Sequence, residues 1–350
     1  MSVRFSSISK NPALAERWES GPRVYPVMSP GDFLCQDAAT PLCEVYNAAG
    51  AVCRFSTNCE PLLEAARESF LPVQGPTVSV DFSVRFWVDP INSALTPWPK
   101  PYVRGLNHLV FAGFDSGSSM LADLRARRVI GRFSAAIGND RSYWKTVVFP
   151  VLFTIAGASL GIVELHSSCV ARQQSGLLLV GTGRSGKSTL AVALAQEGFG
   201  FLSDDRTWCS WQSGRLLACG LATTLKLRCD AGKNFRELQG KEPTDLQHGE
   251  WGFRLEPEFA LGLERVRCCE PRWLVFLERS ENPGFRLSNL SSQEAGVRLE
   301  EDLMAELPDA ATAQMEVIEK LAELPCCLLQ YGGRPQVVAK NLTLHFERFR

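Results

Sequence analysis

The residues best suited to chemistry lie in a glycine-rich segment near the middle of the chain. Residues 181–188 read Gly-Thr-Gly-Arg-Ser-Gly-Lys-Ser, which matches the phosphate-binding loop pattern of Gly, four residues, and then Gly-Lys-Ser or Gly-Lys-Thr. The apolar run 176–180 precedes the segment and predicts a strand, while 189–197 predicts a helix. Strand before and helix after is the setting in which this pattern binds phosphate. The alternative is a chance glycine-rich turn.

Each residue type in this loop has a chemical reason to be there. Glycines let backbone N–H groups turn inward toward phosphate oxygens, and the following helix adds unsatisfied donors. A lysine ammonium suits the β- and γ-phosphates, and a serine hydroxyl suits Mg²⁺. We therefore predict ATP and Mg²⁺ as cofactors. The predicted nucleotide-binding residues are Gly181, Thr182, Gly183, Arg184, Ser185, Gly186, Lys187, Ser188 and Thr189.

Two adjacent carboxylates, Asp204 and Asp205, follow the apolar segment 200–203, which predicts a second strand. At a strand end close to the loop, one carboxylate would hold or orient a metal ion, and the other would accept a proton from an incoming hydroxyl. We predict Ser188 and Asp204 as metal ligands, while the choice of the base stays open between the two acids. The alternative is a solvated Asp-Asp-Arg turn.

Together these segments resemble the HPr kinase/phosphorylase C-terminal domain and its relatives, which share the phosphoenolpyruvate-carboxykinase-like nucleotide fold. The relatives carry a His in a Leu-His-small-small segment fifteen residues before the first loop glycine, and Leu165-His166-Ser-Ser stands there in this chain. They also have a Gly before the strand and an Asp pair after it, matched by Gly198 and by the two aspartates. The resemblance covers roughly residues 160–335.

The resemblance implies roles for four residues. Asp204 or Asp205 would activate an acceptor serine, and His166 would lie near the transferring phosphoryl group, although a lone His is more often a packed core residue. The segment from Thr223 to Arg228 looks like the Leu-Lys segment of many relatives, so Lys226 would approach the phosphates. The alternative for Lys226 is a solvated strand face. The predicted catalytic residues are Asp204, Asp205, His166 and Lys226.

The chain also departs from true HPr kinases. Thr189 follows the loop serine where those enzymes have Glu, and their Glu-Ile-Arg-Gly-Leu-Gly signature is absent. We therefore expect neither phosphorylase activity nor HPr as the substrate. The expected function is an ATP-dependent serine kinase that transfers the γ-phosphoryl group of Mg-ATP to a hydroxyl of a protein or peptide. Two alternatives stay open: a non-catalytic ATP-binding regulatory switch, and a small-molecule hydroxyl kinase whose N-terminal half forms a closed pocket.

The elements that must position these residues predict two domains in 350 residues. Residues 161–350 predict an α/β domain with the HPr-kinase-like P-loop kinase fold, and residues 1–160 an N-terminal α+β accessory domain. In the second domain we expect further strands at 273–277 and 327–331, and a helix from a Ser291–Glu294 capping box to about Leu307. In the first domain we expect helices at 60–70, 119–128 and 144–156, with strands at 78–86 and 109–112.

Composition excludes several other classes. The formal charge of -1 gives no bulk attraction for nucleic acid or anionic lipid. The twelve cysteines show no Cys-x-x-Cys spacing, which favours buried thiols over disulfides or a metal site. The start of the chain lacks the apolar core of a signal peptide, and the uncharged run 146–163 is interpreted as a buried helix and a turn. We expect a cytoplasmic protein without stable membrane insertion. The resemblance is compatible with a homo-oligomer.

Overall fold

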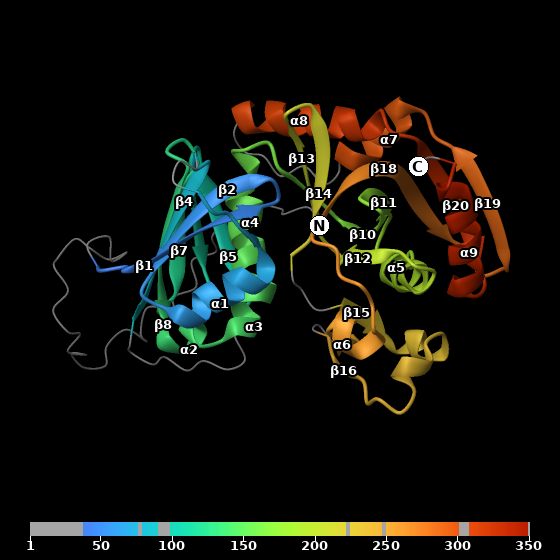
Figure 1. The fold of residues 1–350 in the computed structure, drawn as a ribbon, viewed down its shortest axis with the longest axis horizontal. Coiled ribbons are helices and arrows are strands. Elements are labelled where there is room, and N and C mark those ends of the chain that lie inside the picture. The colour runs from blue at the N-terminus through green and yellow to red at the C-terminus, as the bar shows by residue number, and fades with distance from the viewer. Residues whose placement is uncertain are drawn as a thin grey trace, which may run out of the picture.

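The computed structural model describes residues 38–75, 79–89, 99–221, 225–246, 250–300 and 308–348. These residues form a mixed α/β protein with an eight-stranded, a nine-stranded and a three-stranded sheet. The eight-stranded sheet and its helices lie at one end of the molecule, and the nine-stranded sheet lies at the other (Figure 1). Residue 160 falls between the last helix of the first half and the first strand of the second sheet.

The first sheet has the strand order β3-β1-β2-β4-β8-β7-β6-β5. Its β4 pairs in parallel with β2 and with β8, and the other pairs are antiparallel. Along β2 every second side chain is buried, so one face of the sheet points into the core. The strands are β1 (Leu42–Ala48), β2 (Ala51–Thr57), β3 (Leu71–Pro72), β4 (Phe82–Asp89), β5 (Tyr102–Leu106), β6 (Leu109–Gly113), β7 (Ser119–Asp123) and β8 (Arg128–Ser134).

Helices cover the core face of this sheet. They are α1 (Glu60–Ser69), α2 (Ala135–Gly138), α3 (Arg141–Tyr143), the π-helical turn η2 (Trp144–Val148) and α4 (Phe149–Ala158). The predicted helices at 60–70 and 144–156 are confirmed, although the second one begins as a π-helix. Helix α4 buries eight of its ten residues and is followed by a turn at Gly161, where φ is 69°. Among the described residues no helix is both long and apolar enough to span a membrane.

The predicted helix at 119–128 is wrong. The segment forms β7, a turn and the start of β8. Its Met, Leu, Ala and Arg residues favour a helix, but pairing with β6 and β8 overrides that preference. Met120 and Ala122 are buried while their neighbours are half exposed, which is the period of a strand. The carboxylate of Asp123 accepts hydrogen bonds from the next backbone N–H groups and ends the strand.

Two strand predictions in the first half have different outcomes. The strand at 109–112 is confirmed as β6. The alternation at 78–86 belongs to β4, which begins later, at Phe82, and continues to Asp89. Val78 lies outside the described residues.

The second sheet is organised around the long strand β18 (Cys268–Arg279). Its strand order is β12-β10-β11-β18-β14-β13-β9, and β20 pairs with both β18 and β19. Strands β11 and β20 run parallel to β18 on its two sides. Strand β10 is antiparallel to both β11 and β12, so the predicted strand-helix-strand unit contains β10 between its two strands. The remaining bounds are β9 (Val163–Leu165), β10 (Ser167–Arg172), β11 (Ser175–Val180), β12 (Gly200–Ser203), β13 (Thr207–Gln212), β14 (Arg215–Cys219), β19 (Gly284–Asn289) and β20 (Cys326–Gly332).

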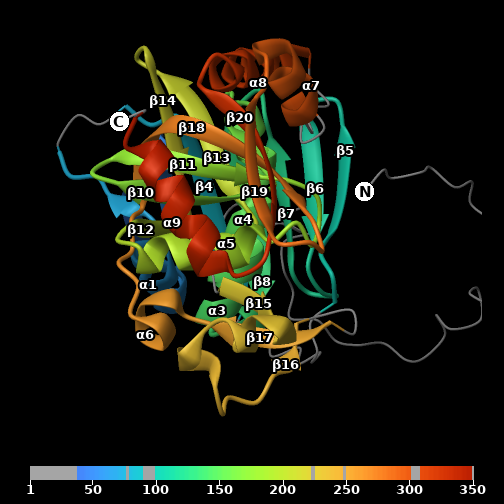
Figure 2. The ribbon, with the colours of Figure 1, turned by 90° about the vertical axis from the view of Figure 1, so that its right-hand side faces the viewer.

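Two pairs of helices cover the two faces of this sheet. Helices α5 (Lys187–Gln196) and α9 (Pro335–Phe346) pack together over one face (Figure 2). Helices α7 (Ser292–Glu300) and α8 (Pro308–Ala322) cover the other. The capping box is confirmed, since Ser291 N donates to Glu294 Oε2 at 3.0 Å and Glu294 N donates to Ser291 Oγ at 3.2 Å. The predicted end of that helix at Leu307 lies outside the described residues.

A small third sheet lies beneath α5 in Figure 1. It contains β15 (Leu225–Arg228), β17 (Trp251–Leu255) and β16 (Thr244–Asp245), in the order β15-β17-β16. Helix α6 (Pro257–Leu261) and the 3₁₀ turns η3 (Cys229–Lys233) and η4 (Arg236–Leu238) accompany it. The cysteines of the described residues are free thiols and most are buried.

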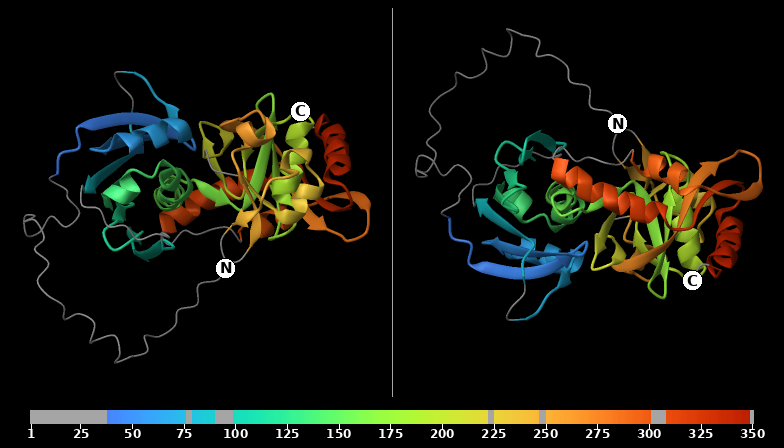
Figure 3. Two further views of the ribbon diagram at one scale, coloured as in Figure 1. Left: turned by 90° about the horizontal axis from the view of Figure 1, so that it is seen from below. Right: turned by 90° about the horizontal axis from the view of Figure 1, so that it is seen from above.

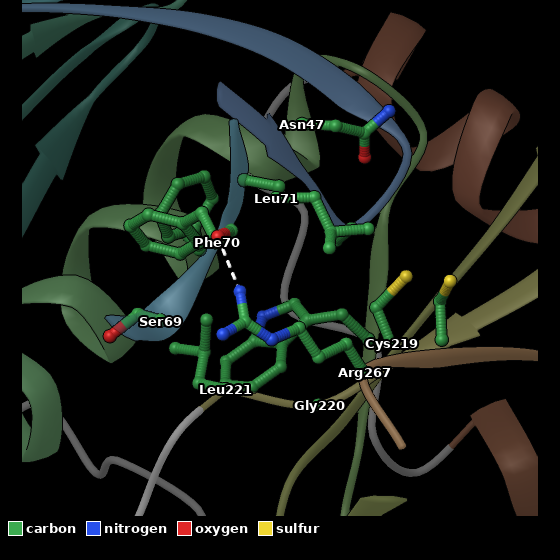
Figure 4. A pocket seen from close by; sticks show the side chains of 13 residues that line it. Asn47, Ser69, Phe70, Leu71, Cys219, Gly220, Leu221 and Arg267 are labelled. Atoms are coloured by element: carbon green, nitrogen blue, oxygen red, sulfur yellow. Dashed lines mark hydrogen bonds between the residues drawn. The ribbon is translucent and has the colours of Figure 1, made fainter. Parts of the chain in front are cut away.

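The two halves share a packed boundary. Trp208 of β13 and Leu221 belong to the same apolar cluster as the core of the first half. Helix α8 reaches from the second sheet toward α4 (Figure 3), and its Gln314 donates to the Ile162 carbonyl at 2.8 Å. Across a small cavity of about 20 Å³, Arg267 Nη1 donates to the Phe70 carbonyl at 2.7 Å (Figure 4).

The boundary contact of Arg267 can be tested by the Arg267→Ala variant. Removing the guanidinium leaves the Phe70 carbonyl without its charged donor, so the free energy of unfolding should fall by about 1.5–3 kcal/mol. Urea unfolding followed by tryptophan fluorescence measures the change. The control is Arg272→Ala, which removes an exposed guanidinium from β18, the strand that begins just after Arg267, and should change stability by less than about 0.5 kcal/mol. Equal effects of the two variants would contradict the prediction.

Candidate active site

The glycine-rich loop joins the end of β11 to the start of α5, as the sequence predicts. Gly186 precedes the helix with a φ of 91°, and a Cβ atom there would lie 2.2 Å from the Tyr331 hydroxyl. That hydroxyl, which comes from β20, donates to the Ser185 carbonyl at 2.7 Å. Glycine is therefore required at position 186 by both its backbone conformation and its neighbour. Tyr331 is a site residue that the sequence predictions missed, because no local pattern links it to the loop.

Lys187 is buried and points its ammonium group into the loop. Its Nζ atom donates to the carbonyls of Gly181 at 2.7 Å and of Thr182 at 3.2 Å. Ser185 Oγ is also buried and makes no hydrogen bond within the described part of the chain. No described heavy atom lies within 4 Å of a Cβ placed on Gly183, so the loop is open there. The loop thus holds one buried cation and an unpaired hydroxyl beside an open backbone.

Asp204 follows β12 and is 7% exposed. Its carboxylate accepts a hydrogen bond from Ser168 Oγ at 3.0 Å and one from the backbone N–H of Lys226 at 3.3 Å. The side chain of Ser188, the last residue of the loop motif, lies close enough to this carboxylate to lower its pKa. Burial has the larger effect and raises the pKa of Asp204. Three separate chain segments therefore meet at one buried carboxylate.

Asp205 points out of the same turn toward His166. Its backbone is left-handed, with a φ of 68°, a conformation that Asp tolerates better than most residues. Asp205 Oδ1 lies 3.2 Å from His166 Nδ1, and the two side chains are 54% and 47% exposed. His166 lies between β9 and β10 and is not a packed core residue. The structure thus brings together His166 and Asp205, which the sequence analysis assigned to one site only through a resemblance.

Lys226 lies on β15, directly opposite Arg254 of β17. Burial lowers the pKa of Lys226, and the charge of Arg254 lowers it further. The lysine side chain lines a cavity together with Asp204 and Asp205, so it is not a solvated strand face. Arg254 was absent from the sequence predictions, since its pairing with Lys226 depends on a strand register.

The other predicted loop residues lie at the outer side of the loop. Thr182, Gly183 and Arg184 are exposed, and Arg184 has a φ of 70° with its guanidinium 3.6 Å from Glu250. Thr189 lies in the first turn of α5 and is half buried. Residues 182–184 therefore lie on the exposed side of the loop, away from the buried Lys187 and Asp204.

A cavity of about 650 Å³ lies between the acid pair and the first half of the chain. Its walls from the first half are mainly apolar and include Pro101, Val103, Tyr143, Val147, Pro150 and Val151. Its walls from the second half are Asp204, Asp205, Arg206, Lys226 and Arg254. None of residues 181–188 lines it. The acid pair therefore separates the loop from a cavity that both halves build.

Comparisons with known proteins add little to this geometry. No family model matches the chain, and no curated protein matches it. Among solved structures, the HPr(Ser) kinase/phosphatase from Coxiella burnetii matches 53% of this chain and 97% of its own, at 12% identity and a TM-score of 0.28. A match this weak carries no argument about fold or activity. The resemblance to HPr kinases therefore stays a prediction.

The burial of Asp204 predicts a stability gain for the Asp204→Asn variant. Because burial raises the pKa of Asp204, the folded protein binds this proton more tightly than the unfolded chain does. Stability then falls as pH rises from the ordinary value of 3.8 through the higher folded value, and it stays lower at pH 7. Each tenfold difference in proton affinity corresponds to about 1.4 kcal/mol. Calorimetry should therefore show a higher Tm for the variant at pH 7, with a gain that shrinks toward pH 4.

The control for this measurement is Asp230→Asn, which removes an exposed carboxylate from η3 and should leave Tm unchanged. A lower Tm for Asp204→Asn at pH 7 would mean that the charge at Asp204 is a net stabiliser, contrary to the prediction.

Proposed function

We propose that this protein transfers the terminal phosphoryl group of Mg²⁺-ATP to a hydroxyl group. The observation that carries the proposal is that Ser188, the last residue of the loop motif, lies beside the buried carboxylate of Asp204. This proximity joins the glycine-rich loop to an acid pair that is separated from it in sequence by a helix and a strand. Phosphoryl transfer depends mainly on such positioning and on stabilisation of charge.

The loop residues fit a triphosphate. The backbone N–H groups at the start of α5 and the open backbone at Gly183 would face phosphate oxygens. Lys187 already holds its charge inside the loop, where it would exchange the carbonyls of Gly181 and Thr182 for phosphate oxygens. The unpaired hydroxyl of Ser185 would gain an acceptor in the same place.

Ser188 and Asp204 are the residues that would hold Mg²⁺, because both present oxygen ligands and already contact each other. When bound, Mg²⁺ would neutralise charge on the phosphate oxygens. Ser168 and the backbone N–H of Lys226 keep the Asp204 carboxylate oriented toward the loop. Asp204 is thereby better placed for the metal than for the acceptor.

Asp205 is the better base. It is exposed to the cavity, and its contact with His166 restrains the carboxylate. In the proposed step Asp205 takes the proton of the acceptor hydroxyl as the acceptor oxygen bonds to the terminal phosphorus. The bond from that phosphorus to the bridging oxygen breaks, and ADP leaves with the electron pair. Lys226 would face the negative charge that develops on the acceptor side.

The acceptor is the hydroxyl of a protein or peptide serine or that of a small molecule. The cavity favours the small molecule, because its volume of about 650 Å³ lies in the range of small-molecule sites. The first half of the chain also walls the cavity opposite the acid pair, which leaves less room for a folded protein substrate than an uncovered acid pair would. A regulatory ATP switch needs no base, so the pairing of Asp205 with His166 argues for the enzyme.

Two variants test the proposed function. The Lys187→Ala variant should bind ATP more weakly and lose transfer, because it removes the buried cation of the loop. The Asp205→Asn variant should bind ATP within about twofold of wild type but turn over about 10²- to 10⁴-fold more slowly, since it lacks the base. Transfer from γ-labelled ATP with Mg²⁺ to serine peptides and to small hydroxylated compounds measures turnover, and calorimetry measures binding.

The Asp230→Asn variant serves as the control, since its carboxylate is exposed and remote in sequence from the acid pair. Label transferred equally well by Lys187→Ala and wild type would refute the role of the loop. Tight ATP binding by wild type without transfer to any acceptor would favour the regulatory switch.

A further inference from the structure

Two cations face each other across the small third sheet. Lys226 of β15 and Arg254 of β17 are directly opposite in the antiparallel register, so their side chains lie on one face of the sheet. Both line the cavity beside the acid pair. Like charges directly opposite one another destabilise a sheet. This arrangement therefore carries a cost in the protein as it stands.

Nothing in the described part of the chain offsets this cost with an ion pair. Neither Lys226 nor Arg254 forms a salt bridge there, whereas the nearby Arg206 pairs with Glu164 at 3.1 Å and Arg228 with Glu250 at 3.1 Å. Asp204 and Asp205 attract Lys226 from a greater distance, but their carboxylates are engaged with Ser168 and His166. The lowered pKa of Lys226 agrees with this charge crowding.

The cation pair lies on the acceptor side of the site. None of the loop residues lines the cavity that Lys226 and Arg254 share with Asp205. The wall from the first half includes the apolar Val103, Val147 and Val151, and also the polar or charged Lys100, Asp140, Ser142 and Thr146. A ligand that fills this cavity meets Lys226 and Arg254, neither of which has an ion pair in the described part of the chain, at one end, and a wall with an apolar part at the other.

We infer that Lys226 and Arg254 form an oxyanion site for the acceptor, so that the acceptor is a small hydroxylated compound carrying a carboxylate or phosphate group. The anion site itself is argued from the cavity and the strand register. The identification of its ligand as the acceptor rests on the proposed function. The anion neutralises both cations, and the apolar wall holds the body of the molecule. Its hydroxyl then lies beside Asp205.

The test titrates inorganic phosphate into the full-length protein by calorimetry, with and without saturating Mg²⁺ and a non-hydrolysable ATP analogue. With the analogue in the loop, wild type should still bind phosphate, since the analogue leaves the cavity open; without the analogue, the empty loop offers phosphate a second site. The Arg254→Gln and Lys226→Gln variants should each bind phosphate about tenfold more weakly or worse and bind the analogue normally. The matched control is Arg228→Gln, which removes a cation of the same strand that does not line the cavity.

Thermal unfolding with and without phosphate gives a second measurement, which separates loss of phosphate binding from loss of folding in a variant. Phosphate should raise the Tm of wild type and of Arg228→Gln but not that of Arg254→Gln. In the absence of phosphate, the Arg254→Gln variant should melt no lower than wild type, because it removes a like-charge pair.

Each other result has a defined meaning. Phosphate binding that does not depend on Arg254 overturns the anion site. Loss of the Arg254-dependent phosphate binding when the analogue is bound, or analogue binding weakened by Arg254→Gln as much as phosphate binding, assigns the cations to the nucleotide and overturns their role with the acceptor. Failure of the proposed function looks different. Wild type that binds phosphate through Arg254 but never binds the analogue supports the anion site and overturns the nucleotide chemistry.

Discussion

The site depends on one buried charge. Asp204 lies at the end of β12 among Ser168, Ser188 and the backbone of Lys226, and each partner comes from a different segment. A buried carboxylate is tolerated only when hydrogen bonds compensate the loss of water. The loop, strand β10 and the small sheet must therefore keep their relative positions for the Asp204 carboxylate to stay buried with its polar partners. The same requirement holds the glycine-rich loop next to the acids.

The second constraint is steric and comes from β20, which lies on the other side of β18 from the strand β11 that precedes the loop. Strands β11, β18 and β20 run parallel, so their carboxyl ends meet at one edge of the sheet, where ligands of α/β proteins commonly bind. Tyr331 at the end of β20 reaches the loop after β11 and bonds to the Ser185 carbonyl. Gly186 leaves the space that this hydroxyl occupies. The loop is thus shaped by a residue nearly 150 positions later in the chain.

Local patterns predicted the parts of the site that are close in sequence. The loop between β11 and α5 and the acids after β12 lie where their flanking apolar runs indicate. Arg254, Tyr331 and the apolar wall of the cavity could not be found this way, because their places depend on strand register and on the packing of the two halves. The wrong helix at 119–128 has the same origin, since its residues favour a helix until β6 and β8 pair with them.

The apolar wall that η2 and α4 contribute has a consequence for side reactions. If the loop binds a triphosphate as proposed, the acid pair beside it would activate any hydroxyl within reach, and water is the most abundant one. The side chains of Val147, Pro150 and Val151 offer such water no hydrogen-bonding partner, so only part of this wall, including Thr146, can hold it. The first half of the chain would then act against wasteful hydrolysis of the nucleotide, in addition to shaping the space for the substrate.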